Sequence, residues 1–400
     1  MNDLAGLNTT ALDMSADAAL QRARSIIPLL RSAAAEIDEK CELPPYILDA
    51  MFDAGLFKLA LPKSLGGAEL KLSEFVACVE AIAMGDAAAA WCMNQASGCS
   101  MASAYMDPVV AREIWGGKRD ALAWGQGPGA KMVRAPGGWH VTGKWTFLSG
   151  SRHATWLGAA CPALEVDGSP AKYADGTPIE HTALFPKSQT TLDGNWKVMG
   201  LKGTGSDGIA LENLFVDDAH VVPRDKPRFR RETGTLYRFQ ATQLYASGFA
   251  SVAMGIARAM LDDFIALAKG KTQAWSTDRL IDNAAIQNLI GHSDAAWKAA
   301  RAGVHKALDD AWDQVLADGE LSLDSKIQIR ESSTYAIHIC RDICHHVFHE
   351  AGSTAILNKL PFERRLRDSN SVSQQIQGRR THFETVGQYY LGLTPSARWL

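Results

Sequence analysis

Residues 121–164 read ALAWGQGPGAKMVRAPGGWHVTGKWTFLSGSRHATWLGAACPAL, and they distinguish this chain from a purely helical protein. Glycine or proline recurs every few residues between short β-branched and aromatic runs, a pattern typical of strands joined by turns. The Pro-Gly-Gly at positions 136–138 separates two of these runs as a hairpin turn would. Strand-like runs continue to about Val222, so this segment predicts a small antiparallel β domain.

On both sides of this segment the hydrophobic periodicity is helical. Residues 16–40 place apolar side chains on one face and charged ones on the other. After the β segment, long runs with few helix breakers predict helices over 235–269, 282–317, 323–357 and 369–390. We therefore expect an α+β protein of three domains: an N-terminal helical domain (1–120), a central β-barrel-like domain (121–230) and a C-terminal four-helix bundle (231–400).

The composition excludes several classes of protein. The 400 residues are 46% hydrophobic and 21% charged, which is typical of a globular protein. A net charge of −3 favours neither nucleic acid nor an anionic membrane as a partner. We see no uncharged apolar run near the ~18–20 residues of a membrane span and no basic-then-apolar leader at the start. Seven cysteines without tight spacing indicate reduced thiols, so we expect a cytoplasmic enzyme.

Two motifs resemble cofactor or metal sites but have simpler explanations. Residues 203–208 match G-x-G-x-x-G, yet a dinucleotide fingerprint must open a helix, and here a strand-like run follows. We interpret the motif as a tight turn. His345 and His349 fall one helical turn apart, but a metal site needs a third ligand, and none is evident. We expect buried or cofactor-facing histidines there and no metal.

The string from Gly143 to Trp156 carries most of the chemistry in the sequence. A strand ends at Ser149-Gly150, which exposes a hydroxyl and backbone amides where the chain turns. His153 follows four residues later and is a candidate proton donor or acceptor near neutral pH. Tryptophans concentrate in this β segment, and they are typical either of sheet packing or of a wall for a flat aromatic ligand.

The helical–β–helical order and several strings resemble the acyl-CoA dehydrogenase superfamily over essentially the whole chain. Three strings carry the resemblance: LFKLALPKSLGG after the N-terminal helices, MGLKGTGS (199–206) with LENLFVDDAHVVP, and LPFER (360–364) followed by Arg367-Asp368. The resemblance implies a homotetramer, or a dimer, that holds a flavin between the β domain and the C-terminal bundle.

Dehydrogenation in this superfamily requires a carboxylate base. Where relatives place that acid, this chain reads Gln375-Ile376-Gln377-Gly378, and the earlier position falls near Tyr245. Glutamine does not accept a proton at neutral pH. The chain is more similar to the oxygenase components of two-component flavin monooxygenases, which hydroxylate phenols, indoles and thiophenes. The strings FLSGSRHATW, from Phe147, and AIAMGDAAAAWC, which contains Trp91, look like that branch.

Carried over to this sequence, the resemblance implies reduced FAD or FMN supplied by a separate NAD(P)H-flavin reductase. It implies that O2 and this flavin hydroxylate an aromatic or heteroaromatic small molecule. Ser149 would lie near flavin N5, and Trp91 and Tyr245 would contact the substrate. Residues implied to bind the flavin are Trp124, Gly125, Gln126, Phe147, Ser149, Gly352 and Gln377.

The resemblance leaves the handling of protons open. Gln375 stands where many members carry a histidine, so the candidate catalytic residues are Ser149, His153, His349 and Gln375. Two other functions also stay open. One is a flavin dehydrogenase or oxidase with an atypical base that acts on a thioester or similar substrate. The other is a non-catalytic relative that keeps the fold for assembly or ligand binding.

Overall fold

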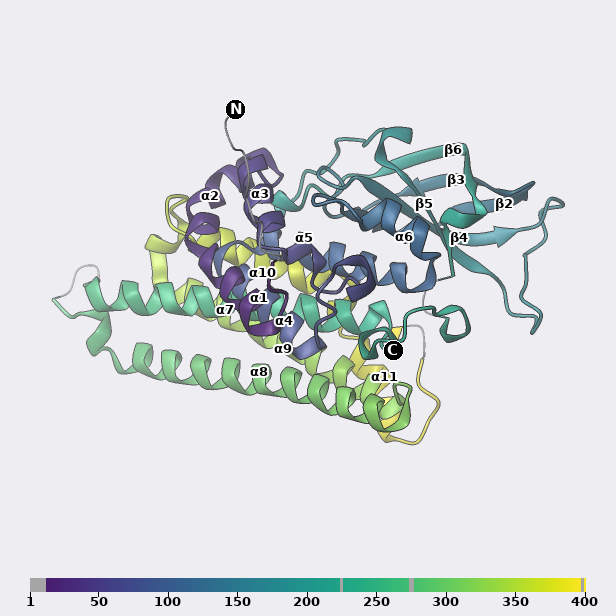
Figure 1. The fold of residues 1–400 in the computed structure, drawn as a ribbon. Coiled ribbons are helices and arrows are strands. Elements are labelled where there is room, and N and C mark those ends of the chain that lie inside the picture. Colours follow the sequence, from purple (N-terminus) through teal and green to yellow (C-terminus); the bar gives the residue numbers. More distant parts are fainter. Residues whose placement is uncertain (1–11, 224–225, 273–276, 397–398) are drawn as a thin grey trace, which may run out of the picture.

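The computed structural model describes residues 12–223, 226–272, 277–396 and 399–400. The expected order of helices, strands and helices is confirmed, and Figure 1 shows the sheet at one end of a long helical body. Residues 1–11, on which the expectation of no leader partly rests, lie outside the described part. The N-terminal helices are α1 (Ala16–Ser25), α2 (Ile27–Lys40), α3 (Pro45–Asp53), α4 (Leu72–Gly85), α5 (Ala87–Ser100) and α6 (Pro108–Trp115).

Local sequence explains how two of these helices begin. Pro45 opens α3, a position where proline loses no hydrogen bond. Asp86 precedes α5, and its carboxylate accepts the backbone N–H of Ala89 at 2.9 Å. Every residue of α5 is buried, as its apolar composition on all faces requires. The helix is therefore a rigid element in the centre of the molecule.

The central region forms one seven-stranded sheet in the order β6-β3-β2-β4-β5-β7, with β1 beside β4. The predicted hairpin joins β2 and β3, with Gly137 in the left-handed region at φ 73°. The sheet is mixed and not purely antiparallel as expected, because β1 and β2 both pair parallel with β4. The strands are β1 (Leu122–Gly125), β2 (Lys131–Ala135), β3 (Gly138–Trp145), β4 (Trp156–Leu164), β5 (Glu180–Pro186), β6 (Ile209–Asp217) and β7 (Val221–Val222).

The parallel pairing has a topological cause. After β3 the chain crosses β2 through residues 146–155 before it returns as β4. The tryptophans flanking this crossing pack in the protein: Trp139 and Trp145 are almost completely buried in the core of the sheet. Sheet packing is thus confirmed for these two side chains, and the crossing segment is left to carry other functions.

The C-terminal region consists of α7 (Ala241–Gly270), α8 (Ala284–Asp318), α9 (Leu323–Ala351), α10 (Phe362–Gln374) and α11 (His382–Tyr390). Helices α7, α8 and α9 run side by side in Figure 1, as expected for a bundle of long helices. The prediction of one helix over 369–390 is wrong. A 3₁₀ turn at Ile376–Gly378 separates α10 from α11, because the Gln375 side chain accepts the N–H of Gln377 at 2.8 Å and caps that turn.

Helix α7 is an exception to the expectation that no apolar run approaches the length of a membrane span. By length and composition alone it is apolar enough to cross a membrane. However, 89% of its most apolar window is buried inside the protein, between α4 and α9. Gly255 permits this close packing, because a β-carbon there would overlap Ala83 and the carbonyl oxygen of Glu80 in α4. The apolar sequence of α7 is that of a core helix.

Candidate active site

Two loops of the sheet region lie side by side. The first, here the serine loop, is the crossing segment 146–155 between β3 and β4; the second, here the glycine loop, is 199–208 before β6. Three hydrogen bonds join the loops: Leu148 N to Asp207 O at 3.2 Å, Gly150 N to Thr204 O at 2.8 Å, and Ser151 Oγ to Gly205 O at 2.9 Å. The two backbone bonds, from Leu148 and Gly150, flank Ser149 and fix it between the loops.

The glycine loop contains the G-x-G-x-x-G match, and the tight-turn interpretation of that motif is confirmed. Lys202–Thr204 form a 3₁₀ turn that leads into strand β6 and not into a helix. Gly205 adopts the left-handed region at φ 48°, where glycine is unstrained. Gly203 lies so close to α2 that a β-carbon would overlap the side chain of Ile37. These glycines therefore serve a turn and a close approach.

The serine loop holds an aromatic ring in a strained position at the surface. Phe147 has φ 60°, which is uncommon for a bulky residue, and its side chain is 64% exposed. Its ring meets the half-buried Trp196 edge-on, with 5.9 Å between centroids. Met199 of the glycine loop is also exposed. A strained, exposed aromatic residue of this kind marks candidate ligand sites.

The Ser149 hydroxyl lies just beneath this surface, in a chain of buried polar groups. Trp91 of α5 donates its indole N–H to Ser149 Oγ at 2.9 Å. Ser149 Oγ lies 2.8 Å from Ser206 Oγ, which in turn lies 2.7 Å from Thr204 Oγ1. Sequence reasoning assigned Trp91 to the substrate, but the structure shows that its polar edge holds Ser149. The hydrogen bonds by which Ser206 and Thr204 continue this chain were not predicted.

Aromatic rings continue from Trp91 into the core. Trp91 stacks on Phe249 of α7 with 3.9 Å between centroids, and Phe249 stacks on Tyr245 at 5.7 Å. Tyr245 donates its hydroxyl to the carbonyl of Gln95 at 3.2 Å. The structure thus brings the two predicted substrate residues into one aromatic stack. Phe249 was missed, although its position four residues after Tyr245 on a helix places both on one face.

The end of β1 lies against the serine loop. Gln126 and Thr146 exchange two backbone hydrogen bonds, of 3.0 and 2.9 Å. Gly125 comes so close that a β-carbon would overlap the Thr146 carbonyl. The carbonyl of Trp124 accepts a hydrogen bond of 3.4 Å from the Gln95 side chain, next to Tyr245. Trp124, Gly125 and Gln126 therefore surround the same place as Phe147, Ser149 and Trp91.

His153 is in the serine loop, but its pKa does not lie near neutral pH, where the sequence predicted it. Burial, with a smaller contribution from the charge of Lys187, lowers the pKa of His153 to about 4. Lys187 is fixed by a 2.8 Å hydrogen bond to the carbonyl of Arg152. The imidazole packs against Phe57, with 5.7 Å between ring centroids. His153 is therefore neutral at pH 7, and its catalytic role stays a prediction.

The other predicted residues lie along α9 and α10. His345, His346 and His349 are exposed and not buried, because the buried face of α9 carries Cys344 and Val347. The alternative expectation, that they face the cofactor, stays a prediction. In the described part of the chain, no three His, Cys, Asp or Glu side chains form a group that could hold a metal ion. Gly352, with φ 61°, ends α9.

Gln375 and Gln377 lie in the turn after α10. The side-chain nitrogen of Gln375 and the side-chain oxygen of Gln377 are buried without a hydrogen-bond partner among the described residues. In the described part of the chain, neither a hydrogen bond nor a ring contact joins Ser149 to Gln375, Gln377, His349 or Gly352. Their assignment to flavin binding or catalysis stays a prediction.

Helix α10 is nevertheless tied to the glycine loop. Asp368 accepts the N–H of Leu201 at 2.6 Å, and Arg367 donates to the carbonyl of Met199 at 2.7 Å while pairing with Asp38 of α2. Burial raises the pKa of Asp368 to about 7. Sequence reasoning used this Arg-Asp pair only as a fold signature, whereas the structure shows that it fixes the loop that carries Ser206.

Known families match both ends of the chain. The family described as acyl-CoA dehydrogenase, N-terminal domain, matches residues 21–107, and acyl-CoA dehydrogenase, C-terminal domain, matches residues 247–377. This chain belongs to the acyl-CoA dehydrogenase superfamily. The matched regions contain α4, α5 and most of α7 to α10, and with them Trp91 and Phe249 of the aromatic stack.

Within the superfamily, the curated relatives are flavin-dependent monooxygenases. Indole-3-acetate monooxygenase of Pseudomonas putida is 26% identical over 380 residues, which are 92% of each chain. The FADH2-dependent resorcinol hydroxylase, oxygenase component, of Rhizobium sp. is 25% identical over 94% of this chain and 95% of its own. The structure of XiaF from Streptomyces sp., in complex with FADH2 and glycerol, matches with a TM-score of 0.88 and 21% identity over 96% of this chain and 98% of its own.

The residues of this superfamily member fit a flavin beside Ser149. A tricyclic ring needs a flat apolar surface and a few polar groups at its edge. Phe147 and Trp196 offer aromatic surface. At the end of β1, Gly125 brings the backbone close to the serine loop without a side chain. Ser149 supplies a hydroxyl that is already held in place by Trp91. The aromatic surface and this single polar group thus suit the edge of an isoalloxazine ring.

Proposed function

We propose that this chain is the oxygenase component of a two-component flavin-dependent monooxygenase, which uses reduced FAD or FMN and O2 to hydroxylate an aromatic or heteroaromatic, phenol- or indole-like molecule. The observation that carries the proposal is the position of the Ser149 hydroxyl. Trp91 fixes it between the exposed aromatic residue of the serine loop and the buried aromatic stack. The relatives support it through the substrates and cofactor in their names.

Bound at this place, a reduced flavin would supply the two electrons that activate O2; one oxygen atom of O2 would pass to the substrate and the other would leave as water. The chain's own residues bind, orient and exclude water. Phe147 and Trp196 hold the flat ring by contact, and Ser149 Oγ fixes the polar edge of that ring. The stack of Trp91, Phe249 and Tyr245 gives the substrate an apolar wall, which keeps water from the reacting atoms.

The dehydrogenase alternative requires a free buried carboxylate as base, and the described part of the chain has none. Gln375 caps its own turn and cannot take a proton. The buried acidic side chains are all engaged: Glu80 with Arg301, Asp207 with Arg152, Asp86 with the N–H of Ala89, and Asp368 with the N–H of Leu201. Aromatic hydroxylation releases its carbon-bound proton only after oxygen has added, when the return to aromaticity makes a dedicated carboxylate base unnecessary, so the same residues favour a monooxygenase.

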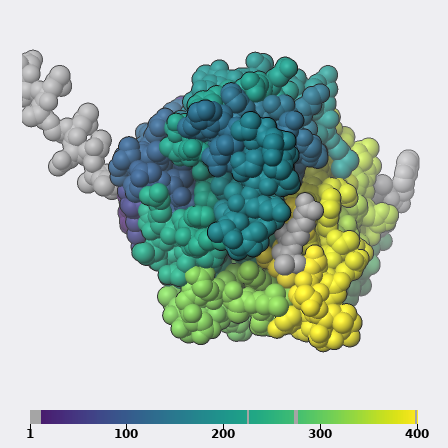
Figure 2. All heavy atoms as spheres, turned by 90° about the vertical axis from the view of Figure 1, so that its right-hand side faces the viewer, coloured from purple at the N-terminus to yellow at the C-terminus, as the bar shows by residue number. Residues whose placement is uncertain are grey.

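The proposal includes a separate NAD(P)H-flavin reductase, because the flavin must arrive reduced. We place the protein in the cytoplasm, where its seven free cysteines stay reduced. The three predicted domains, 1–120, 121–230 and 231–400, are part of the same proposal, with the flavin between the second and the third. Figure 2 shows these two regions meeting on one face of the molecule.

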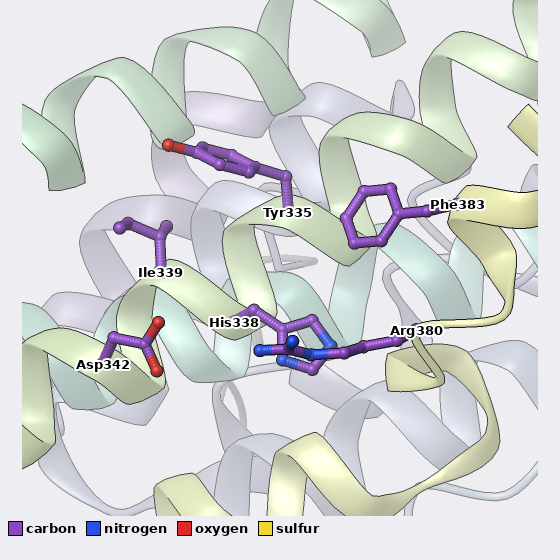
Figure 3. Close-up of a pocket in the computed structure, with 6 residues that line it drawn as sticks. All are labelled: Tyr335, His338, Ile339, Asp342, Arg380 and Phe383. Carbon is purple, nitrogen blue, oxygen red and sulfur yellow. The ribbon is translucent and has the colours of Figure 1, made fainter. Parts of the chain in front are cut away.

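We further propose a homotetramer. A pocket of about 280 Å³ lies open on the outer face of α9 and α11, and Figure 3 shows the residues that line it. Its lining includes the exposed rings of Tyr335 and Phe383, and none of the lining residues belongs to the cluster around Ser149. Leu391 near the C-terminus is 78% exposed as well. Exposed apolar side chains gathered on one face are typical of a surface that a second copy covers.

Product analysis tests the proposed function. The protein is combined with a flavin reductase, NADH, FAD or FMN, and a panel of indoles and phenols under isotopically labelled O2. We expect the label in a hydroxylated product, detected by mass spectrometry. A reductase-only reaction is the control. Tight binding of oxidised flavin, with oxidation of a thioester and no labelled product, would support the dehydrogenase alternative instead.

A further inference from the structure

The hydrogen bonds around Ser149 have a direction that can be worked out from both ends. A hydroxyl has one proton to donate, and an indole nitrogen only donates. At one end, Trp91 donates to Ser149 Oγ at 2.9 Å. At the other end, Thr204 donates its only proton to the carbonyl oxygen of Leu201 at 2.8 Å. Thr204 can therefore only accept from its neighbour.

The middle of the chain follows by elimination. Ser206 must donate to Thr204 across 2.7 Å, because Thr204 has no proton left. Ser149 must then donate to Ser206 across 2.8 Å. Ser206 and Thr204 are 3% and 2% exposed, so water does not compete for these bonds. Ser149 thus donates its proton to Ser206 and not to a ligand. One lone pair of Ser149 Oγ remains to accept a hydrogen bond from a ligand.

We propose that this one-way hydroxyl chain makes Ser149 an acceptor toward the cofactor, so that the site selects reduced over oxidised flavin. The inference rests on the proposed function, in which Ser149 Oγ faces flavin N5. In reduced flavin N5 carries a hydrogen and donates, whereas in oxidised flavin N5 has only a lone pair. An acceptor oxygen bonds to the first and repels the second. Ser206 and Thr204 are then positioning residues that act through Ser149.

The test is the ratio of two dissociation constants, Kd for oxidised FAD over Kd for reduced FAD, measured anaerobically by fluorescence titration. Ser206→Ala removes the acceptor for the Ser149 proton, which can then turn to N5 of oxidised FAD. The one hydrogen bond gained with oxidised FAD predicts that the ratio falls by up to about tenfold. For a two-electron couple this equals a midpoint potential of the bound flavin lower by up to about 30 mV.

Three further variants make the test specific. Thr204→Val removes the last acceptor, so both serine hydroxyls can reverse, and we expect a fall of the same sign. Thr204→Ser keeps the hydroxyl and restores the wild-type ratio. Ser151→Ala is the matched control, because Ser151 is a buried serine of the same loop that donates to Gly205 O at 2.9 Å but is outside the chain. Its ratio should equal that of the wild type.

The outcomes separate the inference from the proposed function. An unchanged ratio in both Ser206→Ala and Thr204→Val, with tight binding of reduced FAD by the wild type, overturns the inference and leaves the monooxygenase proposal standing. A wild type that binds neither reduced FAD nor reduced FMN overturns both. An equal fall in Ser151→Ala also overturns the inference, since any loosening of the loop would then suffice.

Discussion

At the scale of a single residue, Ser149 orients the bound ring and is not its main anchor. Contacts from Phe147 and Trp196 remain in Ser149→Ala, so reduced flavin should bind at most about tenfold more weakly, the worth of one hydrogen bond. Substrate hydroxylated per O2 consumed should fall, and hydrogen peroxide should rise. An oxygen electrode with a peroxide assay measures both quantities. Unchanged coupling, with Ser151→Ala as the control, would contradict this role.

The sequence predicted the centre of the site but not its supports. Ser149 could be singled out because a strand that ends in Ser-Gly is a local signal, whereas Phe147 was implied only by the resemblance. Ser206 is 57 positions away and reaches Ser149 only through two adjacent loops. Nor could local sequence show that burial lowers the pKa of His153, since its neighbour Phe57 belongs to an N-terminal segment.

At the scale of elements, the tie between α10 and the glycine loop should affect stability through pH. Burial raises the pKa of Asp368 to about 7, whereas an unfolded aspartate titrates near pH 3.9. Between these values the native state binds more protons than the unfolded state, so this group makes the free energy of unfolding fall as pH rises from about 4 to 7. The fall is at most about 1.4 kcal/mol per pH unit.

Asp368→Asn keeps the acceptor for Leu201 N–H but removes the titration. We expect the free energy of unfolding of this variant to depend less on pH than that of the wild type. Urea unfolding at pH 5 and pH 7.5 measures this. The control is Asp175→Asn, because hydrogen bonds from Thr177 and the charge of Arg228 lower the pKa of Asp175 to about 2. Asp175 is ionised throughout this window. Equal slopes in wild type and Asp368→Asn would refute the assignment.

Element boundaries show where sequence patterns are insufficient. The long helices were predicted well because their apolar periodicity continues over many turns. The break between α10 and α11 was missed because a side chain, Gln375, and not a proline creates it. The parallel pairing of β4 was missed as well, since strand partners depend on how the segment 146–155 crosses the sheet.

At the scale of the whole molecule, the exposed face of α9 and α11 predicts assembly. Tyr335→Glu combined with Phe383→Glu places two charges at the pocket and should dissociate the tetramer into smaller species. Sedimentation velocity measures the mass. Val166→Glu, at an exposed position outside this face, is the control and should not change it. A monomeric wild type, or a double variant that stays tetrameric, would contradict the proposed interface.

Family membership and the helical–β–helical order follow from the sequence because the signature strings are local and span the chain. The positions of His349 and Gly352 relative to a flavin could not be predicted in the same way. Both lie at the end of α9, where His349 is exposed, and the distance in space from there to Ser149 depends on how the helices pack and not on local sequence.

The most direct measurement is stopped-flow absorbance of the protein first mixed anaerobically with reduced FAD or FMN and then with oxygenated buffer. If the chain is a monooxygenase component, a transient species should appear whose spectrum differs from those of both reduced and oxidised flavin. Addition of a substrate should then shorten its lifetime. Direct return of oxidised flavin at the rate found without protein, with either cofactor, would contradict the central claim.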